Sequence, residues 1–70
     1  MDVITRDVCI VNGFRLTEYQ ITNGKEIIDT FFNIRDAQGV RQGRNYDDVD
    51  EPLKIMLNMY ITSEIPPFFA

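Results

Sequence analysis

The sequence predicts an α+β protein, in which an antiparallel β-meander of three strands, or four, carries a C-terminal amphipathic helix on one face. Asn-Gly pairs separate β-forming runs in the first half, a helical apolar period occurs in the last third, and 70 residues allow one domain. We expect a β-rich part over 2–46, an acidic segment and helix over 47–64, and a tail over 65–70. The alternative is a β-hairpin followed by two helices.

The pair Asn12-Gly13 predicts the first β-hairpin. Asn and Gly tolerate the positive φ that a type I′ turn needs at both central residues, and β-forming runs flank the pair. A two-residue loop predicts two cross-strand pairs: Val11 with Phe14, and Cys9 with Leu16.

The segment 25–36, after the second pair Asn23-Gly24, fits both a strand and a helix. As a helix, its apolar residues lie within an arc of about 160° at 100° per residue. As a strand, its even-numbered residues from Ile28 to Ile34 share one face. Because its central residues are weak helix formers, we favour the strand. A type I turn at 36–39 and a short edge strand or loop over 39–46 follow.

The clearest helix has its body over 53–61. Asp48 or Asp50 can cap its N-terminus, Glu51 complements the positive end of its dipole, and Pro52 fits its first turn. The prolines at 66 and 67 end it, because proline lacks the amide proton that a helix requires.

Two apolar stripes run along this helix. At 100° per residue, the first forms a face suited to the sheet and contains Leu53, Met56, Leu57, Tyr60 and Ile61. Ile55 and Met59 fall on the far side, where they are either covered by the rest of the fold or form a docking strip.

The tail offers a further apolar pair, Phe68 and Phe69. The two prolines before it favour an extended path. We expect the tail to fold back on the core; the alternative is that it reaches into a partner or a second copy of the chain.

The net charge of −4 comes entirely from the last third of the chain. Up to Tyr46 six acids balance six bases, and after it Lys54 alone opposes five acids: Asp47, Asp48, Asp50, Glu51 and Glu64. Nucleic-acid binders need Lys and Arg to replace released counterions, so direct nucleic-acid binding is disfavoured. An acidic face suits a basic protein partner, which it attracts and orients.

Few residues could carry chemistry. The chain has no His, and its single cysteine, Cys9, lies between apolar residues in a predicted strand, as a buried structural cysteine does. The acidic run 47–51 lacks the central Gly and final Glu of a calcium loop. We therefore expect no enzyme, cofactor or metal site. No apolar run is long enough to span a bilayer and no secretory signal is visible, so we expect a cytoplasmic protein.

The leading hypothesis is a non-enzymatic protein-binding module that docks on a basic, nucleic-acid-binding surface of a larger protein. The residues that we expect to bind are acidic or apolar: Asp47, Asp48, Asp50, Glu51, Ile55, Met59, Phe68 and Phe69. Size and acidity are typical of small virus- or plasmid-encoded inhibitors of host machinery, anti-CRISPR proteins among them, and such a protein acts in the host cytoplasm.

Two alternatives remain open. One is a structural homo-oligomer, such as a homodimer, built on the C-terminal helix through Ile55 and Met59. The weaker one is a small transcriptional regulator that binds DNA through Arg41 and Arg44, with Tyr46 stacking on a base.

Overall fold

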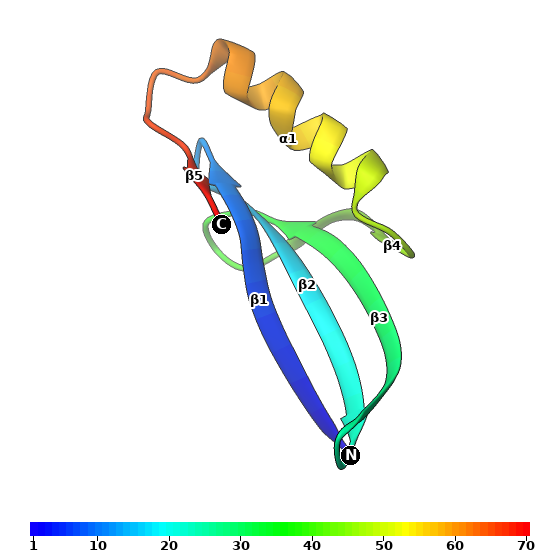
Figure 1. Ribbon diagram of the computed structural model, residues 1–70. Coiled ribbons are helices and arrows are strands. Elements are labelled where there is room, and N and C mark those ends of the chain that lie inside the picture. The colour runs from blue at the N-terminus through cyan, green and yellow to red at the C-terminus, as the bar shows by residue number, and fades with distance from the viewer.

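A five-stranded antiparallel sheet and one helix make up the computed structural model, which describes all residues 1–70. The strand order is β4-β3-β2-β1-β5, and the helix lies across one end of the sheet (Figure 1). The elements are β1 (Asp2–Val11), β2 (Phe14–Asn23), β3 (Glu26–Arg35), β4 (Arg41–Tyr46), α1 (Asp50–Thr62) and β5 (Phe68–Phe69). The predicted α+β class is confirmed: within 39–46, residues Arg41–Tyr46 form a strand, and the tail adds a short fifth strand.

The first hairpin forms in the predicted register. Val11 lies opposite Phe14, and Cys9 lies opposite Leu16. Both loop residues have positive φ, 53° at Asn12 and 82° at Gly13, as a type I′ turn requires. This turn therefore follows directly from the Asn-Gly pair.

The second hairpin turns one residue later than its Asn-Gly pair predicts. Asn23 still belongs to β2 and pairs with Glu26, so Gly24 and Lys25 form the loop. Only Gly24 has positive φ, 63°, which is the pattern of a type II′ turn with Gly at its first central position. A β-bulge in β3 accompanies this turn. Ile21 pairs with Asp29 and Thr22 with Ile27, so the residue between those two partners is the extra one.

The contested segment 25–36 is a strand, as favoured. It pairs with β2 along its length, and its C-terminal half also pairs with β4. The predicted turn over 36–39 is present, with the Gly39 amide donating to the Asp36 carbonyl at 3.0 Å. The Asp36 carboxylate stabilises the turn by accepting from the amides of Gln38 and Val40.

The core lies where α1 covers the sheet. It contains one cluster of buried residues: Cys9, Val11, Leu16, Phe32, Ile34, Tyr46 and Met56. From the helix, Pro52 and Met56 are buried, and Leu53 and Met59 pack beside them. The predicted helix face is therefore wrong in part, because Leu57 and Ile61 are 42% and 81% exposed while Met59 contacts the core. No helix is long and apolar enough to cross a membrane.

The opposite end of the sheet is an uncovered three-stranded arm. It consists of the first half of β1, the second half of β2 and the first half of β3, and it extends away from α1 (Figure 1). The arm accounts for the elongated shape, with extents of 42 × 21 × 19 Å. Its exposed apolar residues are Val3, Ile4, Ile27 and Ile28.

The tail folds back on the chain, as expected, and forms β5. Phe69 pairs with Cys9 and Phe68 with Ile10, and the Ala70 amide donates to the Val8 carbonyl at 2.9 Å. The tail therefore extends the sheet along the edge of β1 instead of hanging free.

Candidate functional site

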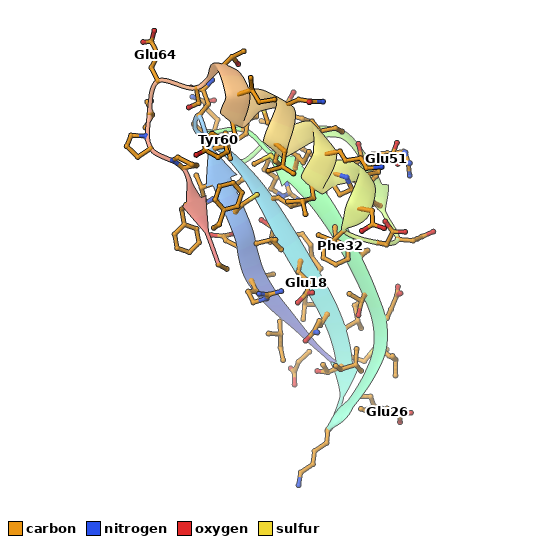
Figure 2. All side chains as sticks on the ribbon, turned by 45° about the horizontal axis from the view of Figure 1, so that its top comes forward. Glu18, Glu26, Phe32, Glu51, Tyr60 and Glu64 are labelled. Carbon is orange, nitrogen blue, oxygen red and sulfur yellow. The ribbon has the colours of Figure 1, made fainter.

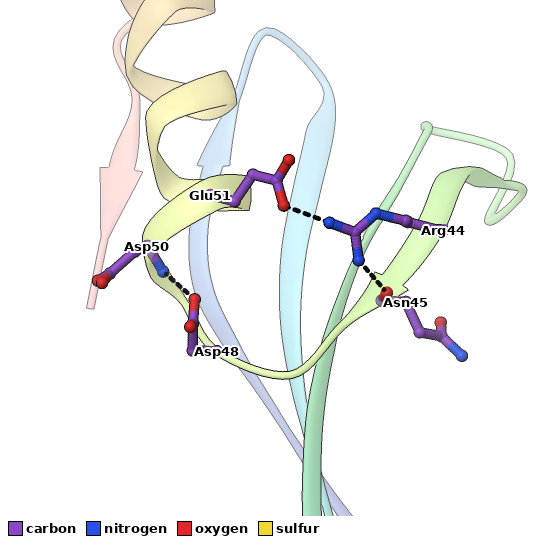
Figure 3. Close-up of polar contacts among 5 residues, drawn as sticks. All are labelled: Arg44, Asn45, Asp48, Asp50 and Glu51. Atoms are coloured by element: carbon purple, nitrogen blue, oxygen red, sulfur yellow. Dashed lines mark hydrogen bonds and ion pairs between the residues drawn. The ribbon is translucent and has the colours of Figure 1, made fainter.

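The site that the sequence singles out is the acidic start of α1, together with the apolar residues further along the helix. Val49 occupies the cap position and makes no side-chain cap bond, so neither predicted aspartate caps the helix directly. Instead the Asp48 carboxylate accepts the Asp50 amide at 3.1 Å, which bends the chain into the helix (Figure 3). Glu51 and Asp50 stand in the first turn, where the helix dipole favours negative charge.

Arg44 is the only cation that touches this acidic segment. Its guanidinium pairs with the Glu51 carboxylate and donates to the Asn45 carbonyl at 3.2 Å (Figure 3). The same guanidinium lies over the Tyr46 ring, 4.4 Å from its centroid. The ring itself is buried against the core. Arg44 and Tyr46 are thus engaged within the chain, which weighs against their predicted role on DNA.

The three aspartates of the segment have no basic partner. Asp47, Asp48 and Asp50 are all exposed, and none forms a salt bridge. Together with Glu51 they do not converge into a group that could hold a metal ion. What remains is a patch of unneutralised negative charge at one end of the helix.

The apolar side chains that α1 shows to solvent differ from those predicted. Ile55 is exposed, as expected, but Met59 packs against the core. Leu57 and Ile61, one turn apart on the other flank, are the exposed pair. Both stripes have the same spacing in the sequence, so periodicity alone could not decide which of them the sheet covers.

The predicted phenylalanines lie apart from the acidic segment. Phe68 and Phe69 sit in β5 and are half-exposed, and the Phe69 ring is 5.7 Å from the Tyr60 ring at the C-terminal part of α1. Figure 2 shows Glu51 and Glu64 at the two ends of the helix region, with Tyr60 nearer to Glu64. The structure therefore places Ile55 and Asp50 on one helix, with Asp47 and Asp48 just before it, but places the two phenylalanines toward its far end.

A separate groove of about 460 Å³ crosses the face of the sheet that α1 does not cover. Two arginines from neighbouring strands line it, and both have partners in the chain. Arg15 pairs with the Asp7 carboxylate at 3.1 Å, and Arg35 donates to the Tyr19 hydroxyl and to the Gly39 carbonyl, both at 2.8 Å. These internal bonds hold both arginine side chains in place, so the groove is a polar surface whose arginines already have partners.

Cys9 lies in the core, as expected for a structural cysteine. Its side chain is buried between the sheet and α1, and burial raises the pKa of the thiol above its ordinary value. A thiol held neutral in this way is a poor nucleophile, which supports the structural interpretation of Cys9.

Comparison of the chain with protein-family models, curated proteins and solved structures finds no match.

Proposed function

We propose that this chain is a small non-enzymatic binding protein that docks on a basic, nucleic-acid-binding surface of a larger protein and so inhibits or modulates it. One observation carries the proposal: three aspartates without basic partners stand at the start of a helix whose exposed side includes Leu57 and Ile61. From Asp50 to Ile61 the helix is about 16 Å long, from a rise of 1.5 Å per residue. Charge and apolar surface thus lie along one helix.

The two parts of this surface have different physical roles. Carboxylates at the helix start resemble the phosphates that a nucleic-acid groove binds, and they attract and orient a basic partner over distances near the Debye length. Leu57 and Ile61 lose contact with water on docking, which supplies affinity that does not depend on salt. The combination predicts fast, salt-sensitive association and slow dissociation.

The partner can be sought by its chemistry. The immobilised chain is exposed to a cell extract, and retained proteins are released with duplex DNA and identified by mass spectrometry. Each protein released by DNA is then purified, and its affinity for the chain is measured at several salt concentrations. Recovery of no nucleic-acid-handling protein contradicts the proposal.

A matched pair of triple variants tests the acidic part. Asp47→Lys, Asp48→Lys and Asp50→Lys together should weaken binding of the purified partner by roughly tenfold or more and flatten its salt dependence. The control carries Glu26→Lys, Asp29→Lys and Glu64→Lys, which change the net charge equally at exposed positions elsewhere. Equal losses in both variants would show that net charge, and not this surface, governs binding.

A second pair of variants tests the apolar part. Ile61→Ser should raise the dissociation rate and leave the association rate nearly unchanged, because Ile61 is 81% exposed in the free chain and acts only after contact. Ile27→Ser, at the exposed arm, is the control. An unchanged dissociation rate for Ile61→Ser would remove Ile61 from the docking surface.

A further inference from the structure

The arm leaves one edge of β1 without a hydrogen-bonding partner. On that side β5 pairs only with Cys9 and Ile10, so the segment Asp2–Asp7 borders solvent. An exposed edge strand presents a row of free amides and carbonyls that can pair with another strand. Val3 and Ile4 in this segment are 60% and 54% exposed, which makes the edge apolar as well as open.

The sequence of this edge is complementary to itself. When the segment pairs antiparallel with a copy of itself about Ile4, Asp2 lies opposite Arg6, and Val3 opposite Thr5. Side chains alternate between the faces of a sheet, so both Asp2–Arg6 pairs and the Ile4–Ile4 pair fall on one face. Opposite charges and β-branched residues directly across a strand pair are stabilising combinations.

We propose that two copies of this chain associate through the Asp2–Asp7 edges of β1, with their Ile4 residues paired across the two-fold axis, to form one continuous antiparallel sheet. The pairing is isologous, so it closes after two copies. Each β5 stays in place, since it covers the stretch beyond Asp7 and the partner strand covers the stretch before Val8. The two helices then lie toward opposite ends of the joined sheet.

Arg6 is placed to serve both its own chain and the second copy. Its side chain is 59% exposed, and only its Nε approaches the Glu18 carboxylate, at 3.4 Å. The terminal guanidinium nitrogens have no partner in the chain. Because a guanidinium has five donors, it can bind Glu18 and the Asp2 carboxylate of the second copy together.

Neighbouring registers and the other open edge fit less well. Shifting the centre to Val3 or Thr5 places Asp2 opposite Ile4 or Val8. On the β3 edge, a centre at Ile28 places Asp29 opposite Ile27, and a centre at Asp29 places two aspartates together. A centre at Ile27 places Lys25 opposite Asp29, but Lys25 lies in the loop before β3, and Glu26 then faces Ile28. The pairing about Ile4 is the one of these registers that matches charge and shape within a single strand.

The test is a charge exchange followed by sedimentation across a range of concentrations. The unaltered chain should sediment as a dimer of the 8.2 kDa chain at high concentration. In Asp2→Lys, the introduced lysine faces Arg6 of the second copy. In Arg6→Glu, the introduced glutamate faces Asp2 of the second copy. Each variant should therefore have a dimer dissociation constant that is roughly tenfold higher or more. Mixed together, the two variants present opposite charges at both positions and should form a heterodimer.

Two controls separate this interface from others. Asp29→Lys, on the open edge of β3, should leave dimerisation unchanged, as should Ile55→Asp on the exposed side of α1. Circular dichroism checks that each variant is folded. Restored association in the mixture supports the proposed register.

Three outcomes would overturn the proposal: a monomer at every concentration, a dimer that both single variants leave intact, or open-ended assembly in which β1 of one chain joins β3 of the next. None of them bears on docking at the helix, which is a separate surface.

Discussion

The two ends of the sheet are built from the same three long strands but are stabilised differently. Under α1, side chains from both layers interlock around Leu16 and Met56, which are fully buried. In the arm, the same strands continue past a β-bulge in β1, between Asp7 and Cys9, and the β-bulge in β3, and most side chains stay in contact with water. Strand pairing here therefore extends well beyond the core that supports it. The arm depends on backbone hydrogen bonds and cross-strand pairs, so it should open separately from the covered end.

The largest expected contrast is between a core truncation and an arm truncation. Leu16→Ala should lower the free energy of unfolding by about 2–5 kcal/mol, because it leaves a cavity beneath α1. Ile27→Ala should cost less than about 1 kcal/mol, because Ile27 is 53% exposed. Urea unfolding followed by circular dichroism measures both. If Leu16→Ala does not fold, Ile34→Val at about 1 kcal/mol gives the same comparison, and equal costs at the two ends would refute it.

The two turns give the next contrast. Alanine at positive φ costs about 1–2 kcal/mol, and an added Cβ at Gly13 meets only Ala37, at an ordinary 4.0 Å. Gly13→Ala should therefore lower global stability by that amount. Gly24→Ala should lower it by less and accelerate amide exchange within the arm, because the arm can open without the core. Hydrogen exchange with urea unfolding measures both, and a larger global loss for Gly24→Ala would show that the arm and the core unfold as one unit.

The buried thiol makes the covered end sensitive to high pH. Burial raises the pKa of Cys9 above its ordinary 9.0, so the folded state holds the proton more tightly than the unfolded state. The stability that the buried neutral thiol contributes is complete below the pKa of Cys9 in the unfolded state. It is lost as pH rises through the pKa of Cys9 in the folded state. The difference in unfolding free energy between the unaltered chain and Cys9→Ala should therefore narrow above about pH 9. A difference that stays constant from pH 7 to pH 10.5 would contradict a buried, neutral thiol.

Ion pairs should give the smallest contrast. Glu18→Gln removes an exposed pair with Arg6 at 3.4 Å and should change stability by less than about 0.5 kcal/mol. Asp7→Ala should cost about 1 kcal/mol, because it removes the carboxylate that accepts from Arg15 at 3.1 Å and from the buried Thr17 hydroxyl at 3.1 Å. The free energy of unfolding, measured at low and high salt in dilute solution, separates the part of each stability change that salt screens from the part that it does not. Equal losses of stability in the two variants would mean that the hydrogen bond from Thr17 to Asp7 adds no stability.

Local chemistry made several elements predictable. The type I′ turn at Asn12-Gly13 needs nothing beyond two residues that tolerate positive φ, and it fixes the first hairpin register. Segment 25–36 fitted both a strand and a helix, and its poor helix formers correctly favoured the strand that it forms. Acidic residues and proline likewise set the start of α1 to within a few positions.

Other features depended on contacts between distant parts of the chain. The second turn shifted to Gly24 and Lys25 when the β2–β3 pairing placed Asn23 opposite Glu26. In the candidate site, the exposed aspartates and Ile55 were predictable, but Leu57 and Ile61 were not. The helix carried two apolar stripes of equal period, and only packing on the sheet selected between them.

Backbone preferences and local charge predicted the α+β class, the first hairpin and the acidic start of the helix, and they favoured the strand at 25–36, because each of these depends on a few neighbouring residues. Contacts between distant segments decided which helix face is buried, that the tail becomes a fifth strand, and that β1 and β3 extend beyond the core as an arm with open edges. Those outcomes depend on which surfaces meet, and burial is a property of the pair of surfaces, which neither sequence segment specifies alone.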